Sequence, residues 1–217
     1  MSTQEKNPEL IEFSKTLSNV PKGEEYEKMI SGMIYDGYGP ELSGARFRAR
    51  KWMHKFNNHF PDDATQESLA ADREQMLQEI MGKLGKGSYI EPPFSIDYGS
   101  NISVGEGLYA NYNLSILDCS IVKIGNRVLF GPNVSLFSAT HDTSVESRRN
   151  FVEYALPITI GDDCWIGGNT TVMPDVTIGK GCTIGAGSVV TKDVPEFSVA
   201  VDVPAKVIKK LEVVPDL

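Results

Sequence analysis

An aliphatic side chain returns at every sixth position through the second half of the chain. From residue 160 to residue 190 these positions are occupied by Ile160, Ile166, Val172, Ile178, Ile184 and Val190. A period of six fits neither an α-helix, which repeats about every 3.6 residues, nor a lone strand, which repeats about every two. It is typical of a parallel β-helix, in which each hexapeptide forms one side of a triangular coil. The sequence therefore predicts a mainly β fold whose core is a column of stacked Ile and Val side chains.

The corners of the predicted coil follow from the same spacing. Four places after each of the first five aliphatic positions the residue is small or compact, the five being Cys164, Thr170, Val176, Cys182 and Ser188. Such residues are expected where the chain turns tightly and a larger side chain would not fit inside. Because Cys164 and Cys182 occupy equivalent corners, we interpret them as small buried thiols, not as a disulfide or a metal site.

The period continues upstream in two further registers. Tyr98, Val104, Ala110 and Ile116 share one register, and Ile124, Phe130 and Leu136 share a second that is offset by two residues. The register of Ile160 extends back to Tyr154, so residues 142–153 are predicted to be an insertion that leaves the coil. Long insertions in compact domains are usually functional or disordered. This one begins directly after His141.

Two helices are predicted before the coils. Ala45, Ala49, Trp52, Met53 and Phe56 have helical spacing, and a second helix is expected from about residue 65 to residue 81. The basic residues on the first helix, Arg46, Arg48, Arg50, Lys51 and Lys55, are interpreted as a solvated face. The predicted domains are a disordered or loosely attached leader (1–23), a helical cap (24–87), a β-helix (88–195) with the insertion 142–153, and a C-terminal tail (196–217) that caps the last coil.

Charge and composition exclude several classes of partner. The net charge of −8 over 217 residues disfavours binding to nucleic acid or to an anionic membrane. The chain starts with polar and charged residues and contains no apolar run long enough to span a bilayer, so the expected location is cytoplasmic. The sequence contains no close pair of Cys residues, and no metal requirement is predicted.

Short motifs are spread over the predicted coils and cap. In the coils they are Tyr109–Asn113, Ile124-Gly-Asn, Gly131-Pro-Asn-Val, Thr140–His141, Pro157–Gly167 and Gly185–Asp193, and in the cap they are Gly32–Asp36, Pro40-Glu-Leu, Phe56–Pro61 and Glu91-Pro-Pro. As a set covering roughly residues 24–210, they are similar to the motifs of the maltose/galactoside O-acetyltransferases, a branch of the hexapeptide-repeat acyltransferases. The resemblance implies a left-handed parallel β-helix, a homotrimer with active sites between subunits, acetyl-CoA as co-substrate and a small-molecule hydroxyl acceptor.

The chemistry of acetyl transfer to an alcohol requires a group that accepts the hydroxyl proton, and a neutral imidazole suits this task near physiological pH. The chain has three His residues. His54 and His59 lie on or just after the first predicted helix, where packing or surface roles are expected. His141 lies at the mouth of the insertion and matches the family's catalytic His, so the resemblance implies that it is the general base. The family often has Pro at the next position, where this chain has Asp142.

The resemblance also implies binding residues. Asn111 matches the family's acceptor-binding Asn, and the further acceptor candidates are Asp36, Asp97, Tyr109 and Glu153. The positions that match the cofactor site are Gly168, Ala186, Thr191 and Lys192, with Lys206, Lys209 and the aromatic Trp165 as further candidates. Small residues let a pantetheine arm approach the backbone, and lysines can meet its phosphates as point charges. Relatives often have Arg at the two tail lysines and Gly where this chain has Asp202.

Two other function classes are open from the sequence. A metal-dependent lyase like the β-helical carbonic anhydrases needs several His ligands, whereas the predicted coils contain one. A non-catalytic solenoid scaffold would not need His141, the insertion and Thr191-Lys192 together. No Cys or Ser nucleophile with a nearby base is indicated, which favours direct transfer over a covalent acetyl-enzyme. The leading hypothesis is an acetyl-CoA-dependent O-acetyltransferase.

Overall fold

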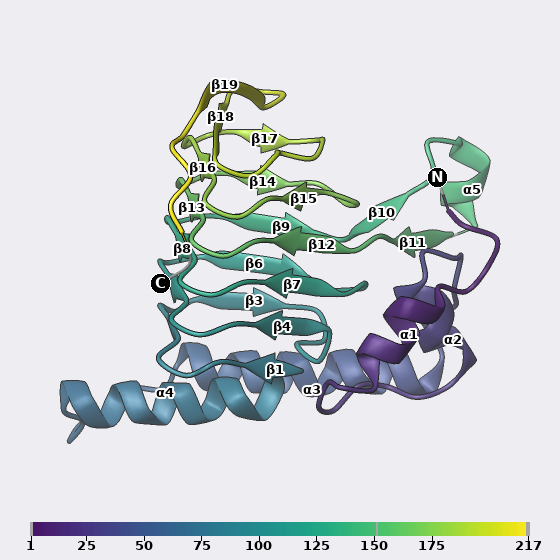
Figure 1. The fold of residues 1–217 in the computed structure, drawn as a ribbon. Helices are drawn as coiled ribbons and strands as arrows, with labels where there is room; N and C mark the ends of the chain where they lie inside the picture. The colour runs from purple at the N-terminus through teal and green to yellow at the C-terminus, as the bar shows by residue number, and fades with distance from the viewer. Residues whose placement is uncertain (1, 151, 216–217) are drawn as a thin grey trace.

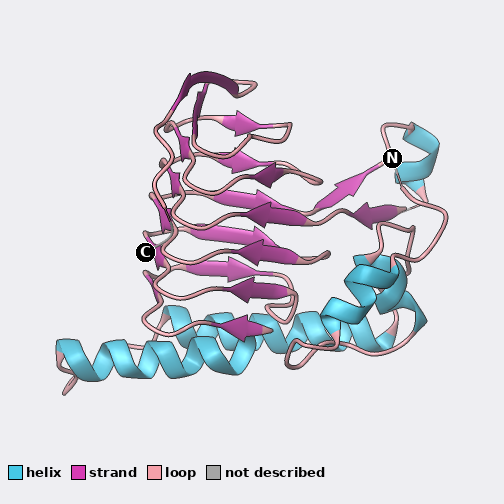
Figure 2. Ribbon diagram, viewed as in Figure 1, coloured by secondary structure: helices cyan, strands magenta, loops and turns pink. Residues whose placement is uncertain are grey.

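A triangular coil of short parallel strands dominates the structure, a computed structural model that describes residues 2–150 and 152–215 (Figure 1 and Figure 2). The first face contains β1 (Lys83–Leu84), β4 (Ile102–Val104), β7 (Val122–Ile124), β12 (Ile158–Ile160) and β15 (Thr177–Ile178). The second contains β2 (Tyr89–Ile90), β5 (Tyr109–Ala110), β8 (Leu129–Phe130), β13 (Trp165–Ile166), β16 (Thr183–Ile184) and β18 (Ser198–Val201). The third contains β3 (Phe94–Ile96), β6 (Leu114–Leu117), β9 (Ser135–Phe137), β14 (Thr171–Val172) and β17 (Val189–Val190). The chain visits the three faces in turn and so forms a parallel β-helix.

The inward positions of the strands form one column, as the period of six predicts. Ile160, Ile166 and Val172 are buried and pair in register with the equivalent residues of the next coil. The compact corner residues predicted from the sequence are buried as well, namely Cys164, Thr170, Val176, Cys182 and Ser188. Fully burying one Val or Ile side chain contributes roughly 1.5–3 kcal/mol, so the column is the main source of stability in the coil.

Two residues lie outside the registers predicted for them. Ile96, not Tyr98, faces the core column, because β3 pairs with β6 at Ile96 and Ile116. Extra residues between the third and first faces of the early coils place Tyr98 against the cap helices instead. Tyr154 also lies outside the coil, in a strand of the insertion. The coil itself starts at β1, before the predicted boundary at residue 88.

The insertion forms an arm that extends from the corner between the third and first faces (Figure 1). β10 (Ala139–His141) pairs antiparallel with β11 (Glu153–Ala155), and the short helix α5 (Val145–Arg149) lies between them. Ser144 caps α5 by accepting a hydrogen bond from the backbone N–H of Ser147. The arm therefore carries His141 away from the body of the coil.

Helices close the first coil. α3 (Pro40–Asn57) and α4 (Gln66–Ile80) lie across its end, and α2 (Glu24–Ile30) lies near the arm (Figure 1). Trp52 stacks on Phe56, and both rings meet Phe94 of β3 edge-on. Both helices predicted from apolar spacing are present, and their apolar sides cover the open edge of the first coil. None of the helices in the described residues is long and apolar enough to cross a membrane.

The two ends of the chain also pack on the domain. β19 (Lys206–Lys210) pairs antiparallel with β18 above the last coil, where a cap was expected. The leader, expected to be disordered or loosely attached, instead contains α1 (Pro8–Ser14) and packs against a second apolar cluster beside α2. Asn7 caps α1 by accepting from the N–H groups of Glu9 and Leu10. The helix is too short to show a clear apolar period in the sequence, which explains the difference.

Candidate active site

His141 is the last residue of β10, and its side chain is exposed. Its Nδ1 lies 3.1 Å from the carbonyl oxygen of Val152, the residue before β11. Because a carbonyl oxygen only accepts hydrogen bonds, this contact places the ring proton of the neutral imidazole on Nδ1. Nε2 is then the unprotonated nitrogen, and its lone pair can accept a proton. The arm thus holds His141 in the tautomer that a general base requires.

A hollow of about 240 Å³ is lined by His141, Tyr38, Arg148 and Glu153. Glu153 stands directly opposite His141 in the β10–β11 pair, where cross-strand Cα atoms are about 4.5–5.5 Å apart. The hollow therefore combines an imidazole, a carboxylate, a guanidinium and a phenol. Such a set can bind a polar molecule through several of its hydroxyl groups.

The turn after His141 is held by its own side chains. The Asp142 carboxylate accepts from the backbone N–H of Ser144 at 2.8 Å. Arg148 reaches back from α5, and its Nη1 donates to the carbonyl oxygen of Thr143 at 2.6 Å and to that of Asp142 at 3.2 Å. Asp142, which stands where the family often has Pro, therefore stabilises the turn.

The loop after α2 forms the cap side of this region. Asp36 lies on it, and its Oδ1 accepts from the backbone N–H of Tyr38 at 2.9 Å. A second hollow, of about 380 Å³, is lined in part by Asp36 and Val152. A methyl group at Gly37 would come within 2.7 Å of Oε1 of Glu153. The cap loop and the arm thus meet around two of the predicted acceptor residues, Asp36 and Glu153.

Arg46 links the cap loop to the coil. Its guanidinium donates to the phenol oxygen of Tyr98 at 2.6 Å and to the carbonyl oxygen of Gly37. The interpretation of Arg46 as part of a solvated face is therefore wrong, since the side chain is half-buried and doubly bonded. The sequence contained one sign of this: Arg46 directly follows Ala45, at the border of the apolar stripe of α3.

Asp97 lies on the coil side of the same region. Its carboxylate accepts from the Cys119 thiol at 3.5 Å and lies 3.7 Å from Arg50. The backbone N–H groups of Asp97 and Tyr98 both donate to Oδ1 of Asp118, at 3.0 Å and 2.9 Å. Asp118 is fully buried, and its Oδ2 finds no hydrogen-bond partner among the described residues. Burial raises the pKa of Asp118 to about 7.

The raised pKa of Asp118 leads to a prediction about stability. A carboxyl group whose pKa is higher in the folded than in the unfolded chain holds its proton more tightly when folded, so the free energy of unfolding falls as pH rises from about 4 to about 7. Asp118→Asn keeps the oxygen that accepts from Asp97 and Tyr98 but removes the charge. We expect this variant to gain more than about 1 kcal/mol over the native chain between about pH 5 and pH 8. Denaturant unfolding across this range measures the gain, and a difference that does not vary with pH would contradict it.

A second group of predicted residues lies along the edge between the second and third faces. Asn111, Gly168 and Ala186 follow β5, β13 and β16 in different coils. The backbone N–H of Gly187 donates to the carbonyl oxygen of Gly168 at 2.8 Å, which ties neighbouring coils together. A methyl group at Gly167 would come within 2.5 Å of the backbone nitrogen of Ala186, so only glycine fits there. Neighbouring coils therefore lie close together along this narrow edge, which the side chains of Asn113, Asn133 and Asn169 also line.

Apolar side chains cover the outer side of the second face beside this edge. Tyr109, Leu129 and Trp165 are 39%, 47% and 55% exposed and occupy paired positions on β5, β8 and β13. Tyr89 continues the row on β2, with its ring stacked on that of Tyr109. Such a contiguous row is typical of a surface that binds another molecule. Leu129 was not predicted, because the period of six marks its neighbour Phe130 as inward but assigns no role to an outward residue.

The remaining cofactor candidates divide between two places. Lys206 and Lys209 lie on β19, which extends the second face beyond the last coil. Thr191 and Lys192 follow β17, at the edge where the third face meets the first. Asp202 has a φ of 84°, a left-handed conformation that favours glycine, which is the residue relatives often have there.

The group around His141 and the group around Asn111 lie at opposite ends of the third face (Figure 1). β6, β9 and β14 run from the edge that carries Asn111 to the edge from which the arm leaves. At about 3.3 Å per residue along β9 and into β10, the separation between Asn111 and His141 is on the order of 20 Å. Within one chain, therefore, His141 is brought together with Asp36 and Glu153 but not with Asn111, Gly168 or Ala186.

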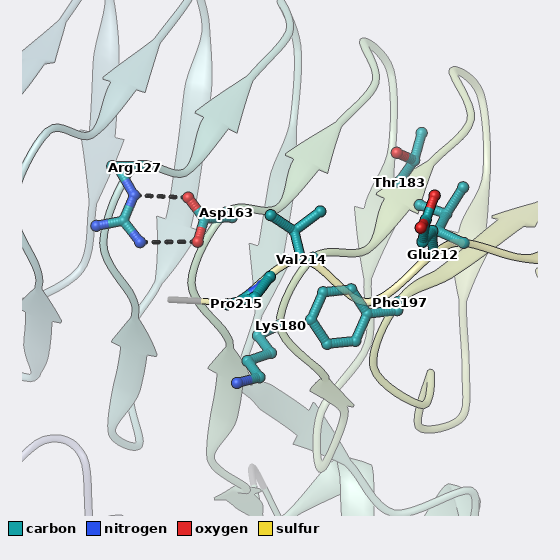
Figure 3. A pocket seen from close by; sticks show the side chains of 10 residues that line it. Arg127, Asp163, Lys180, Thr183, Phe197, Glu212, Val214 and Pro215 are labelled. Atoms are coloured by element: carbon teal, nitrogen blue, oxygen red, sulfur yellow. Dashed lines mark hydrogen bonds and ion pairs between the residues drawn. The ribbon is translucent and has the colours of Figure 1, made fainter. Parts of the chain in front are cut away.

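Another hollow, of about 390 Å³, lies at the edge between the first and second faces (Figure 3). Its lining includes Lys180, Phe197 and four residues of the tail, Leu211, Glu212, Val214 and Pro215. Arg127 and Asp163 form two hydrogen bonds beside it, at 2.6 Å and 2.7 Å. None of the predicted site residues lines this hollow, so it is separate from the candidate active site.

Within residues 2–150 and 152–215, no three or more His, Cys, Asp or Glu side chains are grouped so that they could hold a metal ion.

Comparison with known proteins places the chain in a family. The maltose acetyltransferase hexapeptide capping motif matches residues 28–85, and the bacterial transferase hexapeptide model of six repeats matches residues 157–192. The galactoside O-acetyltransferase of Escherichia coli is 39% identical over 85% of this chain and 88% of its own length. The chain belongs to the maltose/galactoside O-acetyltransferase family.

Solved structures of this family have the same fold. The maltose O-acetyltransferase from Clostridium difficile 630 has a TM-score of 0.82 and 41% identity, over 88% of this chain and 98% of that one. A galactoside acetyltransferase solved in complex with coenzyme A has a TM-score of 0.81 and 38% identity, over 88% and 92%. These matches confirm the predicted β-helix with its helical cap and make the chain an acyltransferase, as the motifs indicated.

Proposed function

We propose that this chain transfers an acetyl group from acetyl-CoA directly to a hydroxyl group of a sugar or another small molecule, with His141 as the general base. The observation that carries the proposal is the hydrogen bond from Nδ1 of His141 to Val152, which leaves Nε2 free to accept a proton. Family membership supports the reaction class, and the coenzyme A complex of a galactoside acetyltransferase supports the cofactor.

The reaction follows from this geometry in two proton transfers. The acceptor hydroxyl gives its proton to Nε2 of His141 as its oxygen attacks the thioester carbonyl carbon. The resulting tetrahedral intermediate collapses by breaking the carbon–sulfur bond, and the imidazolium returns the proton to the leaving thiolate. The products are the acetyl ester and free CoA, and His141 regains its neutral form. No covalent acetyl-enzyme is required.

The complete site is proposed to form between subunits of a homotrimer. Within one chain, His141 is far from Asn111, Gly168 and Ala186. This is because His141 lies at one edge of the third face and the other three residues lie at the opposite edge. Three subunits whose β-helices pack around a common axis would bring the arm of one subunit against the exposed second face of its neighbour. The row of Tyr109, Leu129 and Trp165 would then be covered.

Cofactor and acceptor occupy different parts of this proposed cleft. The pantetheine arm would lie along the narrow edge at Gly168 and Ala186, flanked by Trp165. The phosphates would meet Lys206 and Lys209 of one subunit and Thr191 and Lys192 of the other. The acceptor would bind near the arm and cap loop, in contact with Asn111, Tyr109, Asp36, Asp97 and Glu153. The proposal places the enzyme in the cytoplasm.

Incubation with acetyl-CoA, a thiol reagent and a panel of sugars, other alcohols and amines tests the activity. We expect thiol release with at least one hydroxyl acceptor, accompanied by an acetyl ester that mass spectrometry detects. Thiol release with amines alone, or no release with any acceptor, would contradict the proposed function. Light scattering tests the assembly, and a stable monomer mass at micromolar concentration would contradict the trimer.

A further inference from the structure

We propose that residues 2–20 form a strap that positions the cap loop, residues 32–39, beside His141 and so sets the affinity for the acceptor. This role rests on the proposed function. The strap precedes both of the segments that the family models match. It is defined by its contacts with the cap and the coil.

The strap meets the cap at the end of α2. The backbone N–H of Thr3 donates to the carbonyl oxygen of Gly32 at 2.8 Å, and Oγ1 of Thr3 donates to the carbonyl oxygen of Ser31 at 2.9 Å. The backbone N–H of Asn7 donates to Oγ of Ser31, also at 2.9 Å. Ser31 is buried. Three hydrogen bonds thus converge on the two residues at which the cap loop begins.

Gly32 is the turning point at this junction. It has a φ of 82°, and the backbone N–H of Met33 donates to the carbonyl oxygen of Lys28 at 3.1 Å, which is the bond that ends a helix in a Schellman motif. A methyl group at Gly32 would come within 2.9 Å of Leu156 and 3.4 Å of Thr3. The strap, the cap loop and the chain that leaves the arm therefore pack together here, and moving Thr3 would free one side of the turn.

A charge cluster holds this end of the strap in place. Nζ of Lys6 lies 2.5 Å from a carboxylate oxygen of Glu24 and 2.7 Å from one of Glu27, both on α2. A single exposed ion pair contributes only about 0.2–1 kcal/mol. Two carboxylates that share one ammonium also fix the position of the strap along the helix, which a single pair would not.

The other end of the strap is anchored on the coil. The Lys123 ammonium of β7 lies 3.9 Å from the centre of the Phe13 ring. The backbone N–H of Ser18 donates to the carbonyl oxygen of Gly82 at 2.8 Å. The strap therefore connects the solenoid to the end of α2, and it holds the start of the cap loop at a fixed position relative to the coil.

The strap acts on the acceptor side of the proposed site. The cap loop contributes Asp36 and Tyr38 to the two hollows beside the arm, one of which contains His141. The proposed cofactor residues Gly168 and Ala186 lie on upper coils, whereas α1 and α2 lie at the level of the first coils (Figure 1). Loosening the strap should therefore weaken acceptor binding and leave cofactor binding unchanged.

Charge reversal in the full chain tests this proposal. Lys6→Glu places a carboxylate against Glu24 and Glu27. The control Lys15→Glu reverses an exposed charge of the same segment, whose ion pair lies within the segment, with Glu12 at 2.7 Å. With maltose and p-nitrophenyl-β-galactoside as acceptors, Lys6→Glu should raise the acceptor KM about ten-fold and change the acetyl-CoA KM less than two-fold. Restoring the attraction with Glu24→Lys and Glu27→Lys should recover the acceptor KM. Equal acceptor KM values in the Lys6 and Lys15 variants would overturn the proposal.

Hydrogen exchange provides a second measurement that needs no turnover. Without substrates, Lys6→Glu should speed amide exchange in residues 32–38 at least about five-fold relative to Lys15→Glu. Unchanged exchange there, even with a lower melting temperature, would show a segment that only stabilises the fold and would overturn the proposal. If the native chain acetylates neither probe, neither one is its acceptor, and exchange alone decides the role of the strap.

Discussion

His141→Ala is expected to lower kcat by about 10²–10⁴-fold, the usual contribution of a positioned general base. The residue is exposed at the end of β10 and is not part of the core column, so its loss should leave the fold intact. The KM for acetyl-CoA should change little, because the proposed cofactor residues lie on other elements. Steady-state kinetics with a good acceptor measure both quantities.

His54→Ala is the matched control for this variant. His54 is exposed on α3 and takes no part in the hollow that contains His141. We expect the control to keep native turnover and the native melting temperature. If His141→Ala also kept near-native turnover, His141 would not be the base and the proposed mechanism would be wrong.

Ala186→Trp is expected to lower kcat/KM for acetyl-CoA by about 10²-fold or more. Ala186 is exposed at the narrow edge, so an indole can be accommodated by the fold but would fill the space proposed for the pantetheine arm. A hundred-fold loss of CoA affinity corresponds to roughly 2.7 kcal/mol of binding free energy. Calorimetric titration of the protein with CoA should show the loss of affinity directly.

Glu106→Trp is the control for the added indole. Glu106 is exposed after β4, at the edge between the first and second faces and away from the edge that carries Ala186. This variant should bind CoA like the native chain. Native affinity in both variants would mean that the cofactor does not lie along the edge between the second and third faces.

The sequence predicted the coil well because its determinant is local and repeated. Each inward position, such as Ile166 or Val172, must hold an aliphatic residue to stack on the coils above and below, so the period is visible without any structure. Tyr98 was misplaced because extra residues at the corners of the early coils shift the register by two, and a buried tyrosine is compatible with either assignment. Handedness came from the resemblance, since a period of six does not fix it.

The candidate site was predicted less completely, because its residues depend on contacts between distant segments. The tautomer of His141 is set by the carbonyl group of Val152, which has no side-chain signature. From the sequence alone, Arg46 has the pattern of a surface cation. Its hydrogen bonds to Tyr98 and to the cap loop are visible only in the structure. The separation of Asn111 from His141 is a property of the coil geometry that no local sequence pattern contains, and the proposed shared site depends on it.

Complementation between two inactive variants tests the proposed shared site most directly. His141→Ala and Ala186→Trp carry different tags, are co-expressed, and the mixed oligomers are purified through both tags. If each site takes His141 from one subunit and the cofactor edge from its neighbour, every mixed trimer selected through both tags has about one site in three with both parts intact. Activity should then recover to roughly a third of the native value, far above either variant alone. Mixed oligomers that are no more active than the separate variants would mean that each site lies within a single chain, and the account would be contradicted.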